Sequence, residues 1–229
     1  MARAHEFAPD RTDISYALTE QLLLLDYVRS AEEVLTNTMK ANPSDPLLLV
    51  GEGDLKAAES QHAAAVEFYQ EALVQQPGSI AALIGLSRAN ILQGKEDQAR
   101  TYLQRALAVD PGNSAANGTL GLMELHQGNW DLAITHLRSS WEKDQSNSEV
   151  LLGLARAYRR ADRSGDALGV LAAVDSGVRN TPAFHLELSQ VYSQLHRTQD
   201  AKKEQESFRA LQANTRGGLR FDKPQSYVF

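Results

Sequence analysis

The sequence predicts an all-α fold in which pairs of antiparallel helices repeat and stack along the chain as a solenoid. Two observations lead to this prediction. Prolines recur every 34 residues, at Pro9, Pro43, Pro77 and Pro111, and each period contains two stretches whose apolar residues follow helical spacing. Because each helix pair in such an array packs only on its neighbours, one repeating unit accounts for most of the 229 residues.

The 34-residue period divides the chain into six units without insertion or deletion: 12–45, 46–79, 80–113, 114–147, 148–181 and 182–215. The twentieth position is always alanine: Ala31, Ala65, Ala99, Ala133, Ala167 and Ala201. The eighth position is always small: Thr19, Gly53, Ser87, Gly121, Ala155 and Ser189. The last position always favours a helix N-cap: Asp45, Ser79, Asn113, Asn147, Thr181 and Thr215. We expect the small side chains to let paired helices cross closely, since a larger residue would overpack the crossing.

Each unit predicts a first helix, a break and a second helix. In the third unit Leu83 and Leu86 follow helical spacing, Gly94 interrupts the pattern, and Ala99 and Leu103 begin a second apolar face that ends before Pro111. Acidic residues in the first turn of the second helix favour its positive end: Asp97, Asp131, Asp166 and Asp200. We expect each helix to have about 13 residues and a length of roughly 20 Å.

The two ends of the chain depart from the pattern. Residues 1–11 match the end of a second helix, so we interpret them as the remnant of a preceding repeat, either excised from a longer array or kept as a cap. Gly217 and Gly218 interrupt the helical pattern, and residues 216–229 are expected to form an extended tail. The apolar residues of this tail favour docking on the last helix or self-association with a second molecule, and a disordered linker is the alternative.

The repeat resembles the tetratricopeptide repeat, because it combines a 34-residue period, small residues at positions eight and twenty, Tyr158 or Tyr192 at position eleven and a proline near the end. The resemblance covers residues 12–215. The signature tryptophan at position four is replaced by Leu49, Leu83, Asn117 and Leu151. The resemblance implies a right-handed superhelical solenoid whose first helices line a concave groove that binds a protein or peptide segment.

Groove positions of this family select a set of candidate partner-binding residues: Tyr16, Glu20, Asp54, Ile84, Arg88, Ile91, Leu122, Leu125, Arg156, Arg159 and Arg160. The set is acidic at its beginning, apolar in its middle and basic at its end. Arg156, Arg159 and Arg160 share one helix face, where guanidinium groups could hold carboxylates. The expected partner is therefore an acidic segment with apolar anchors. The alternative is a solvated charged face that Glu149 and Asp162 partly neutralise.

Composition and motifs argue against several other classes of function. A net charge of −6 and a pI near 5.5 disfavour a nucleic-acid binder and a polybasic membrane-surface protein. The chain has no cysteine, and its histidines do not follow metal-ligand spacing. No phosphate-binding glycine loop or convergent carboxylate pair is recognisable, so we expect no catalytic site, metal or cofactor. No apolar run is long enough for a signal peptide or a transmembrane segment, so we expect a soluble chain.

These observations predict a non-enzymatic interaction scaffold that binds a partner segment in its concave groove. Two alternatives remain open: a regulatory or substrate-recruiting repeat arm of a larger enzyme or assembly, and an array that mainly self-associates.

Overall fold

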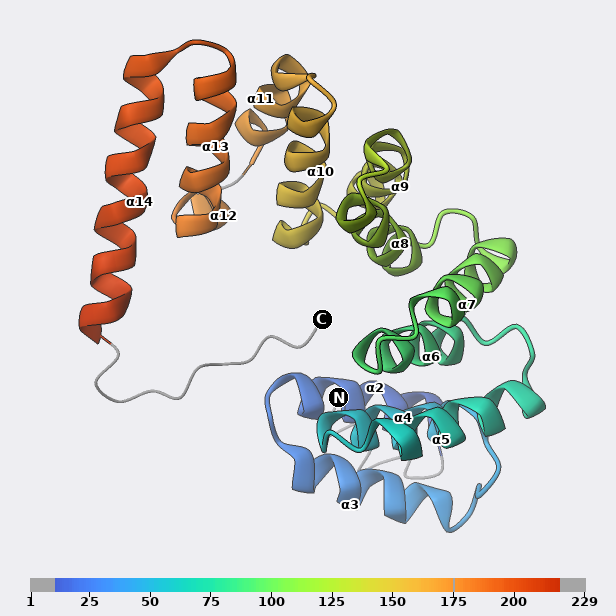
Figure 1. The fold of residues 1–229 in the computed structure, drawn as a ribbon. Coiled ribbons are helices and arrows are strands. Elements are labelled where there is room, and N and C mark those ends of the chain that lie inside the picture. Colours follow the sequence, from blue (N-terminus) through green and yellow to red (C-terminus); the bar gives the residue numbers. More distant parts are fainter. Residues whose placement is uncertain (1–10, 175, 219–229) are drawn as a thin grey trace. The chain divides into compact units, whose positions relative to one another are not determined.

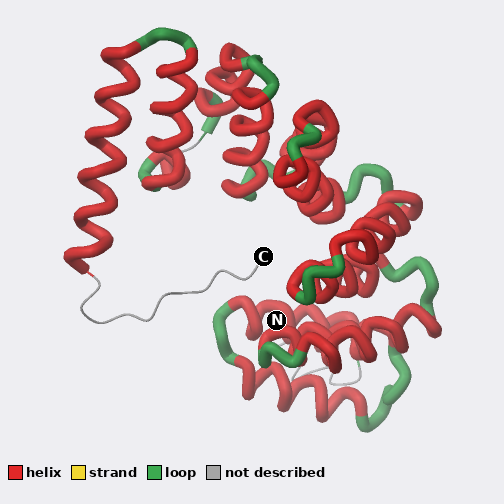
Figure 2. The backbone as a smooth tube through the Cα atoms, viewed as in Figure 1, coloured by secondary structure: helices red, strands yellow, loops and turns green. Residues whose placement is uncertain are grey.

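The computed structural model describes residues 11–174 and 176–218, and every regular element in these ranges is an α-helix (Figure 1 and Figure 2). The chain divides into two compact units, Met1–Pro111 and Gly112–Phe229. Unit 1 contains α2 (Thr12–Leu24), α3 (Val28–Met39), α4 (Pro46–Ala58), α5 (His62–Gln75), α6 (Ile80–Leu92) and α7 (Glu96–Val109). Unit 2 contains α8 (Ser114–Gln127), α9 (Trp130–Lys143), α10 (Ser148–Arg160), α11 (Ser164–Ala172), α12 (Ser176–Arg179), α13 (Pro182–Gln194) and α14 (Thr198–Gly218).

Successive helices pack as antiparallel pairs within each unit, which confirms the predicted all-helical fold class. The pairs are α2 with α3, α4 with α5 and α6 with α7 in unit 1, and α8 with α9, α10 with α11 and α13 with α14 in unit 2. The first helices also contact one another, since α10 packs against both α8 and α13. A first helix therefore has neighbours on both sides, which places its outward side chains beside those of the adjacent repeats.

Small residues at the helix crossings are buried as the sequence predicts. The alanines at position twenty have exposed fractions of 5% or less, and all six residues of the position-eight column are also buried. Large apolar residues such as Leu35, Leu103 and Leu137 then fill the space beside each crossing. Close approach of two helices thus depends on the absence of side-chain volume at these two positions.

Each first helix from α4 onward begins at a side-chain cap. Asp45, Ser79, Asn113, Asn147 and Thr181 accept hydrogen bonds from backbone N–H groups in the first turns of α4, α6, α8, α10 and α13. Thr215 stands at the same repeat position but lies inside α14, so its expected role as a cap is wrong.

The turn within each helix pair contains one residue in the left-handed backbone conformation, and this residue recurs every 34 positions: Asp26, Ser60, Gly94, Gly128, Asp162 and His196. Only two of the six are glycine, although glycine is the residue that adopts this conformation without steric cost. The turn geometry is therefore the same in all six helix pairs, although the residue type at the left-handed position varies.

Two of the predicted helices depart clearly from the expected length of about 13 residues. Helix α11 has 9 residues and is followed by the four-residue α12. Val174 lies between the two helices and packs into the core of unit 2, where it is 6% exposed. Helix α14 has 21 residues and continues through Gly218, so residues 216–218 are helical and not extended. A glycine costs a helix only about 1 kcal/mol, which does not by itself end it. Residues 1–10 and 219–229, which include most of the expected remnant and tail, lie outside the described residues.

Candidate functional site

Unit 1 contains a cluster of acidic and tyrosine side chains, which we call the acid–tyrosine cluster: Tyr16 and Glu20 from α2, Asp54 from α4 and Tyr69 from α5. The hydroxyl of Tyr69 donates a 2.7 Å hydrogen bond to Oδ1 of Asp54, and the hydroxyl of Tyr16 donates a 3.0 Å bond to Oε1 of Glu20. Each tyrosine thus satisfies one carboxylate. Three members of the cluster were candidates from the sequence, and the structure brings them together around Tyr69.

The ring of Tyr69 occupies space that two glycines leave open. A Cβ atom added to Gly53 would lie 2.4 Å from the ring, and one added to Gly85 would lie 2.5 Å from it. Gly53 belongs to α4 and Gly85 to α6, so the ring of Tyr69 packs against both helices. Tyr69 is only 2% exposed, and its hydroxyl reaches Asp54 because neither helix has a side chain in its path.

The electrostatics of the cluster raise several pKa values. Burial is the largest cause that raises the pKa of Asp54, from 3.8 to about 6; the charge of Glu20 raises it further, while the Tyr69 hydrogen bond and the charge of Arg88 lower it. Burial, followed by the charge of Asp54, also raises the pKa of the Tyr16 and Tyr69 hydroxyls above their ordinary value of 10.0. Asp54 therefore keeps a proton to a higher pH than an exposed aspartate would.

The remaining candidates in unit 1 lie on α6. Arg88 is exposed, and its charge acts on Asp54. Ile91 is half-buried, whereas Ile84 is only 8% exposed. The structure thus argues against Ile84 as an apolar anchor for a partner, because its side chain already belongs to the interior of the unit.

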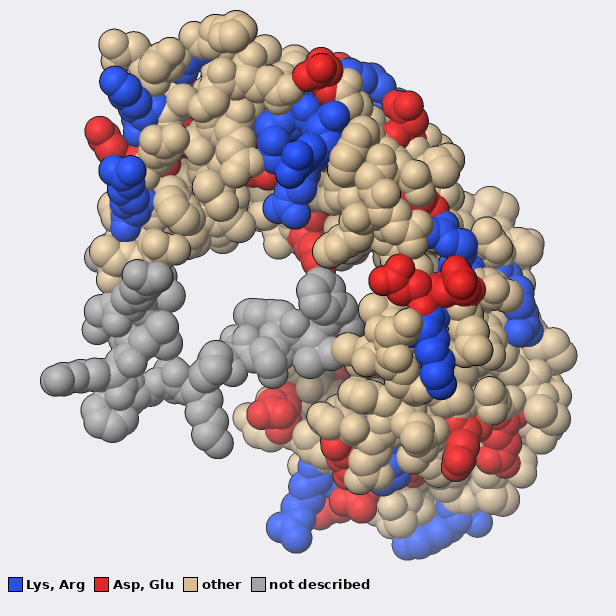
Figure 3. All heavy atoms as spheres, viewed as in Figure 1, with Lys and Arg blue, Asp and Glu red and all other residues tan. Residues whose placement is uncertain are grey.

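In unit 2 the three candidate arginines of α10 differ in their surroundings. Arg159 donates from Nε to Oε1 of Glu187 at 2.7 Å, and Arg156 donates from Nε to Oε2 of the same carboxylate at 3.3 Å. The side chain of Glu187, on α13, is 4% exposed, and that of Arg159 is 14% exposed. Arg160 forms no hydrogen bond or ion pair with any residue that the structure describes. Figure 3 shows that basic side chains gather on the visible surface over α10.

The carboxylate that neutralises part of this group is Glu187, and not Glu149 or Asp162 as the sequence suggested. Asp162 instead accepts a 2.6 Å hydrogen bond from Nε2 of Gln194. Glu187 lies 28 positions after Arg159 and reaches it because α13 packs against α10. One buried acid thus joins two successive repeats.

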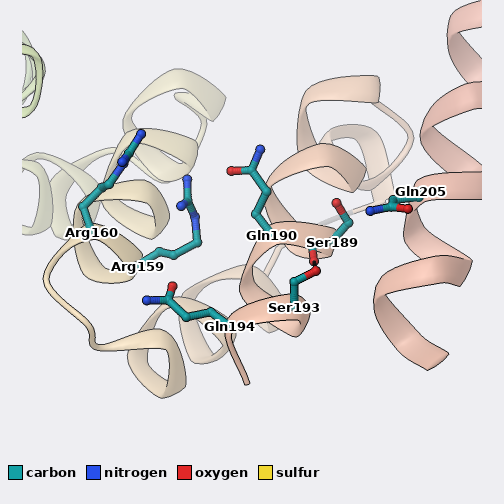
Figure 4. Close-up of a pocket in the computed structure, with 7 residues that line it drawn as sticks. All are labelled: Arg159, Arg160, Ser189, Gln190, Ser193, Gln194 and Gln205. Atoms are coloured by element: carbon teal, nitrogen blue, oxygen red, sulfur yellow. Dashed lines mark hydrogen bonds between the residues drawn. The ribbon is translucent and has the colours of Figure 1, made fainter. Parts of the chain in front are cut away.

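An open pocket of about 550 Å³ lies beside this group. Its lining consists of Arg159 and Arg160 from α10, Ser189, Gln190, Ser193 and Gln194 from α13, and Gln205 from α14 (Figure 4). The ends of the Arg159, Arg160 and Gln190 side chains lie on the same side of the two helices in Figure 4. Every residue of the lining is polar, and none has a carboxylate.

The apolar candidates of unit 2 are partly core residues. Leu125 is 6% exposed and belongs to the hydrophobic core, so it presents little surface to a partner. Leu122 is half-buried beside that core, and Leu152 has a similar position on α10. Leu186, on α13, is 40% exposed. Apolar contact on this surface would therefore come from Leu122, Leu152 and Leu186 rather than from Leu125.

Tyr69 and Glu187 were not among the sequence candidates, but each of them carries a recognisable signal. Position twenty-four is leucine in four of the six repeats, and the exceptions are Tyr69 and Gln205: Leu35, Tyr69, Leu103, Leu137, Leu171 and Gln205. Position six has a small residue in five of the six repeats and an acid only at Glu187: Ala17, Gly51, Gly85, Thr119, Gly153 and Glu187. At each of the two sites, one residue therefore differs in type from the residues at the same position of the other repeats.

Features of other functional classes are not found in the described part of the chain. No group of three or more His, Cys, Asp or Glu side chains there could hold a metal ion. No helix among these residues is long and apolar enough to cross a membrane.

Models of the tetratricopeptide repeat match residues 28–80, 56–122 and 124–190, which is most of the chain. The chain belongs to the tetratricopeptide repeat family. No curated protein gives a significant sequence match. Members of this family are in general protein-interaction modules, and a protein-interaction scaffold is the function that family membership supports.

Solved structures of tetratricopeptide repeat proteins have the same fold. PilW, a widely conserved type IV pilus biogenesis factor, has a TM-score of 0.72 and 21% identity, covering 91% of this chain and 95% of its own. PilF of Pseudomonas aeruginosa has a TM-score of 0.73 and 16% identity, covering 89% and 97%. MamA from MSR-1 has a TM-score of 0.63 and 20% identity, covering 74% and 98%. At these identities the similarity concerns the fold alone.

Proposed function

We propose that this tetratricopeptide repeat protein docks an acidic segment of a partner protein on the first-helix face of unit 2, meaning the surface formed by α8, α10 and α13. The observation that carries the proposal is the charge imbalance on α10: Glu187 pairs with Arg156 and Arg159, and Arg160 has no carboxylate partner among the described residues. Guanidinium groups bind carboxylates with two parallel hydrogen bonds, which gives both affinity and orientation. Leu122, Leu152 and Leu186 supply apolar contacts on the same helices.

The first-helix face of unit 1 provides a second surface of different polarity. Tyr16, Glu20, Asp54 and Arg88 come from α2, α4 and α6, and Ile91 adds half-buried apolar area. We include these residues in the partner-binding surface. The raised pKa of Asp54 supports this assignment, because titratable groups whose pKa is shifted by burial are frequent at functional sites.

A peptide selection tests the proposal. A random 12-residue display library is selected on the full chain, and the enriched peptides are measured by fluorescence polarisation against the parent and against the double variant Arg156→Gln/Arg160→Gln. Enrichment in Asp and Glu is expected, with roughly tenfold weaker binding to the variant and a reduced dependence on salt. Arg159 is left unchanged because its loss would leave Glu187 buried without its closest partner.

The matched control is Arg209→Gln, which removes an exposed arginine on α14. Its binding should equal that of the parent, and the circular dichroism spectra of all variants should coincide. Enrichment of neutral or basic peptides, or equal loss in the control, would exclude the acidic-segment assignment.

The wider sequence-based interpretations remain proposals beside this one. They are the six-repeat division of residues 12–215, the regulatory arm of a larger assembly, and self-association through the C-terminal tail. Deleting residues 219–229 and measuring the solution mass by light scattering tests the last of these. A dimer that becomes a monomer on deletion would support self-association, and an unchanged mass would argue against it.

A further inference from the structure

The turn between α2 and α3 exposes three large apolar side chains, Leu24, Leu25 and Tyr27, which we call the apolar turn. Their exposed fractions are 77%, 62% and 59%. The backbone of the turn is regular, because the N–H groups of Leu25, Asp26 and Tyr27 donate hydrogen bonds of 3.2, 3.0 and 2.8 Å to carbonyl oxygens of α2. These side chains therefore meet water at a well-formed turn, although exposure of apolar surface is unfavourable.

The first repeat alone has large apolar residues at all three of these positions. Position sixteen, where Tyr27 stands, is polar in the other five repeats: Gln61, Lys95, Asn129, Arg163 and Arg197. Positions thirteen and fourteen together contain at most one leucine in any other repeat: Ala58 and Glu59, Leu92 and Gln93, His126 and Gln127, Arg160 and Ala161, and Gln194 and Leu195. The other repeats form the same turn, so the fold does not require the apolar side chains. Exposed apolar groups of this kind are typical of an interaction surface.

The surroundings of the apolar turn are acidic. Asp26 lies within the turn, Glu20 lies one helical turn before Leu24, and both side chains are exposed. Residues 1–111 contain 16 acidic and 9 basic residues, whereas residues 112–229 contain 13 acidic and 14 basic residues. An occupant that complements this surface should therefore combine apolar and basic side chains.

The C-terminal segment of the same chain has this composition. Residues 219–229, which lie outside the described residues, have the sequence LRFDKPQSYVF. Five of these residues are large and apolar, and two basic residues accompany one acid. Arg220 stands between Leu219 and Phe221, just as Asp26 stands between Leu25 and Tyr27.

The last helix offers this segment a less suitable surface. The exposed side chains of α14 include Lys202, Lys203 and Arg209, which have the same sign of charge as the segment. Phe208 and Leu211 are the large apolar residues of the described part of α14, and both are already half-buried. Charge and apolar area thus both favour the apolar turn over α14.

We propose that residues 219–229 of one molecule dock on the apolar turn of a second molecule, where Arg220 pairs with Asp26. This inference rests on the self-association through the C-terminal tail proposed above, and it assigns the docking site. Two apolar turns facing each other would bury too little area, because a stable interface needs about 800 Å² per partner. A reciprocal exchange of segments forms the contact twice in one closed dimer.

Sedimentation equilibrium of the full chain over a dilution series tests the inference. Leu25→Gln/Tyr27→Gln introduces the residue type that Gln93 and Gln61 provide at the same positions, so the turn should be preserved. We expect this variant to weaken the dimer at least about tenfold. Val74→Gln removes an apolar side chain of α5 that is also 77% exposed, and its dimer should match that of the parent.

The ion pair has its own test. Asp26→Ser places at this position the residue type of Ser60, which has the same left-handed conformation. Asp26→Ser and Arg220→Gln should each weaken the dimer roughly two- to fivefold, the range of an exposed ion pair. The double variant should be no weaker than either single variant. Additive losses would show that Arg220 and Asp26 do not meet.

Photochemical cross-linking locates the segment directly. Phe221→p-benzoylphenylalanine is introduced into the full chain, and ¹⁵N-labelled and unlabelled molecules are mixed before irradiation. Mass spectrometry should find cross-links between labelled and unlabelled chains at residues 24–27, and Leu25→Gln/Tyr27→Gln should remove them. Cross-links confined to one chain, cross-links to α14, or a parent that stays monomeric at every concentration would each overturn the inference.

Failure of the site is distinguishable from failure of the proposals on which it rests. If deleting residues 219–229 abolishes the dimer while Leu25→Gln/Tyr27→Gln leaves it unchanged, self-association through the tail stands and the apolar turn is not its site. If neither change affects the solution mass, both proposals fall. The docking of an acidic partner segment on α10 is measured separately and is unaffected by either outcome.

Discussion

The hydroxyl of Tyr69 on α5 donates a 2.7 Å hydrogen bond to the carboxylate of Asp54 on α4, 15 positions earlier in the chain. The tyrosine is buried. Burial raises the pKa of Asp54, whereas the hydrogen bond from Tyr69 lowers it, because a carboxylate that accepts a hydrogen bond is stabilised in its ionised form. The free energy of unfolding should therefore change when either residue is replaced.

Tyr69→Phe should lower the free energy of unfolding by about 1–3 kcal/mol, because the buried carboxylate loses a donor while the ring volume is retained. The pKa of Asp54 should rise further, since the Tyr69 hydrogen bond lowers it. Urea unfolding followed by circular dichroism measures the first effect. Tyr27→Phe, which removes the hydroxyl of an exposed tyrosine, serves as the control and should leave stability unchanged.

Asp54 should make the stability of unit 1 depend on pH between about 4 and 6. Its folded pKa of about 6 exceeds the ordinary 3.8, so its contribution is fully present below pH 3.8 and is lost as the pH rises through 6. The parent should lose up to about 3 kcal/mol relative to Asp54→Asn across this interval. Parallel stability curves for the parent and Asp54→Asn from pH 3.5 to 7.5 would show that Asp54 does not titrate as proposed.

Gly85→Ala should destabilise the chain by about 1–3 kcal/mol, although alanine favours a helix over glycine by about 1 kcal/mol. The reason is that the new Cβ would lie 2.5 Å from the ring of Tyr69. Gly169→Ala is a matched control, because this glycine lies inside α11 with no atom within 4 Å of the added Cβ. That variant should gain stability. Combining Gly85→Ala with Tyr69→Leu should cost less than the sum of the two single changes, and an additive double variant would contradict the contact.

Glu187→Ala should cost about 2–4 kcal/mol, because it leaves the largely buried guanidinium of Arg159 without its carboxylate. Glu206→Ala removes an exposed acid of α14 and should change stability by less than about 0.5 kcal/mol. Thermal unfolding compares the two variants. Equal melting temperatures would show that the Arg159–Glu187 pair contributes no more than a surface charge.

His196→Gly should stabilise the chain by about 0.5–1 kcal/mol, because a non-glycine residue at a φ of 59° bears a steric cost that glycine does not. Lys202→Gly, inside α14, should have the opposite sign, since a glycine in a helix interior costs about 1 kcal/mol. Differential scanning calorimetry of the two variants gives the comparison, and a lower melting temperature for His196→Gly would contradict it.

The fold could be predicted from the 34-residue period, because each repeated residue meets a requirement within its own helix pair. Ala99 or Ala133 is conspicuous in the sequence and is buried in the structure, since a helix crossing imposes the same small volume in every unit. The caps at Asp45 and Ser79 follow in the same way from the need of a helix start. Such columns are readable from one chain.

The contacts of the candidate sites could not be predicted in this way, because they join residues from different columns. Glu187 reaches Arg159 and Arg156 over 28 and 31 positions, and neither helix alone indicates the pair. Tyr69 belongs to a second helix, whereas all the sequence candidates lie on first helices. Burial of Ile84 and Leu125 likewise depends on the packing of adjacent repeats.

The packing of Tyr69 against Gly85 limits how freely these repeats can be exchanged. Repeat arrays are commonly shortened, lengthened or shuffled in protein engineering as if each repeat were an independent module. Here the residue that makes room for a tyrosine of one repeat stands in the next repeat. A chimaera that transplants residues 46–79 without Gly85 would receive a side chain where the ring must lie. The smallest transferable piece of this array is therefore longer than one period.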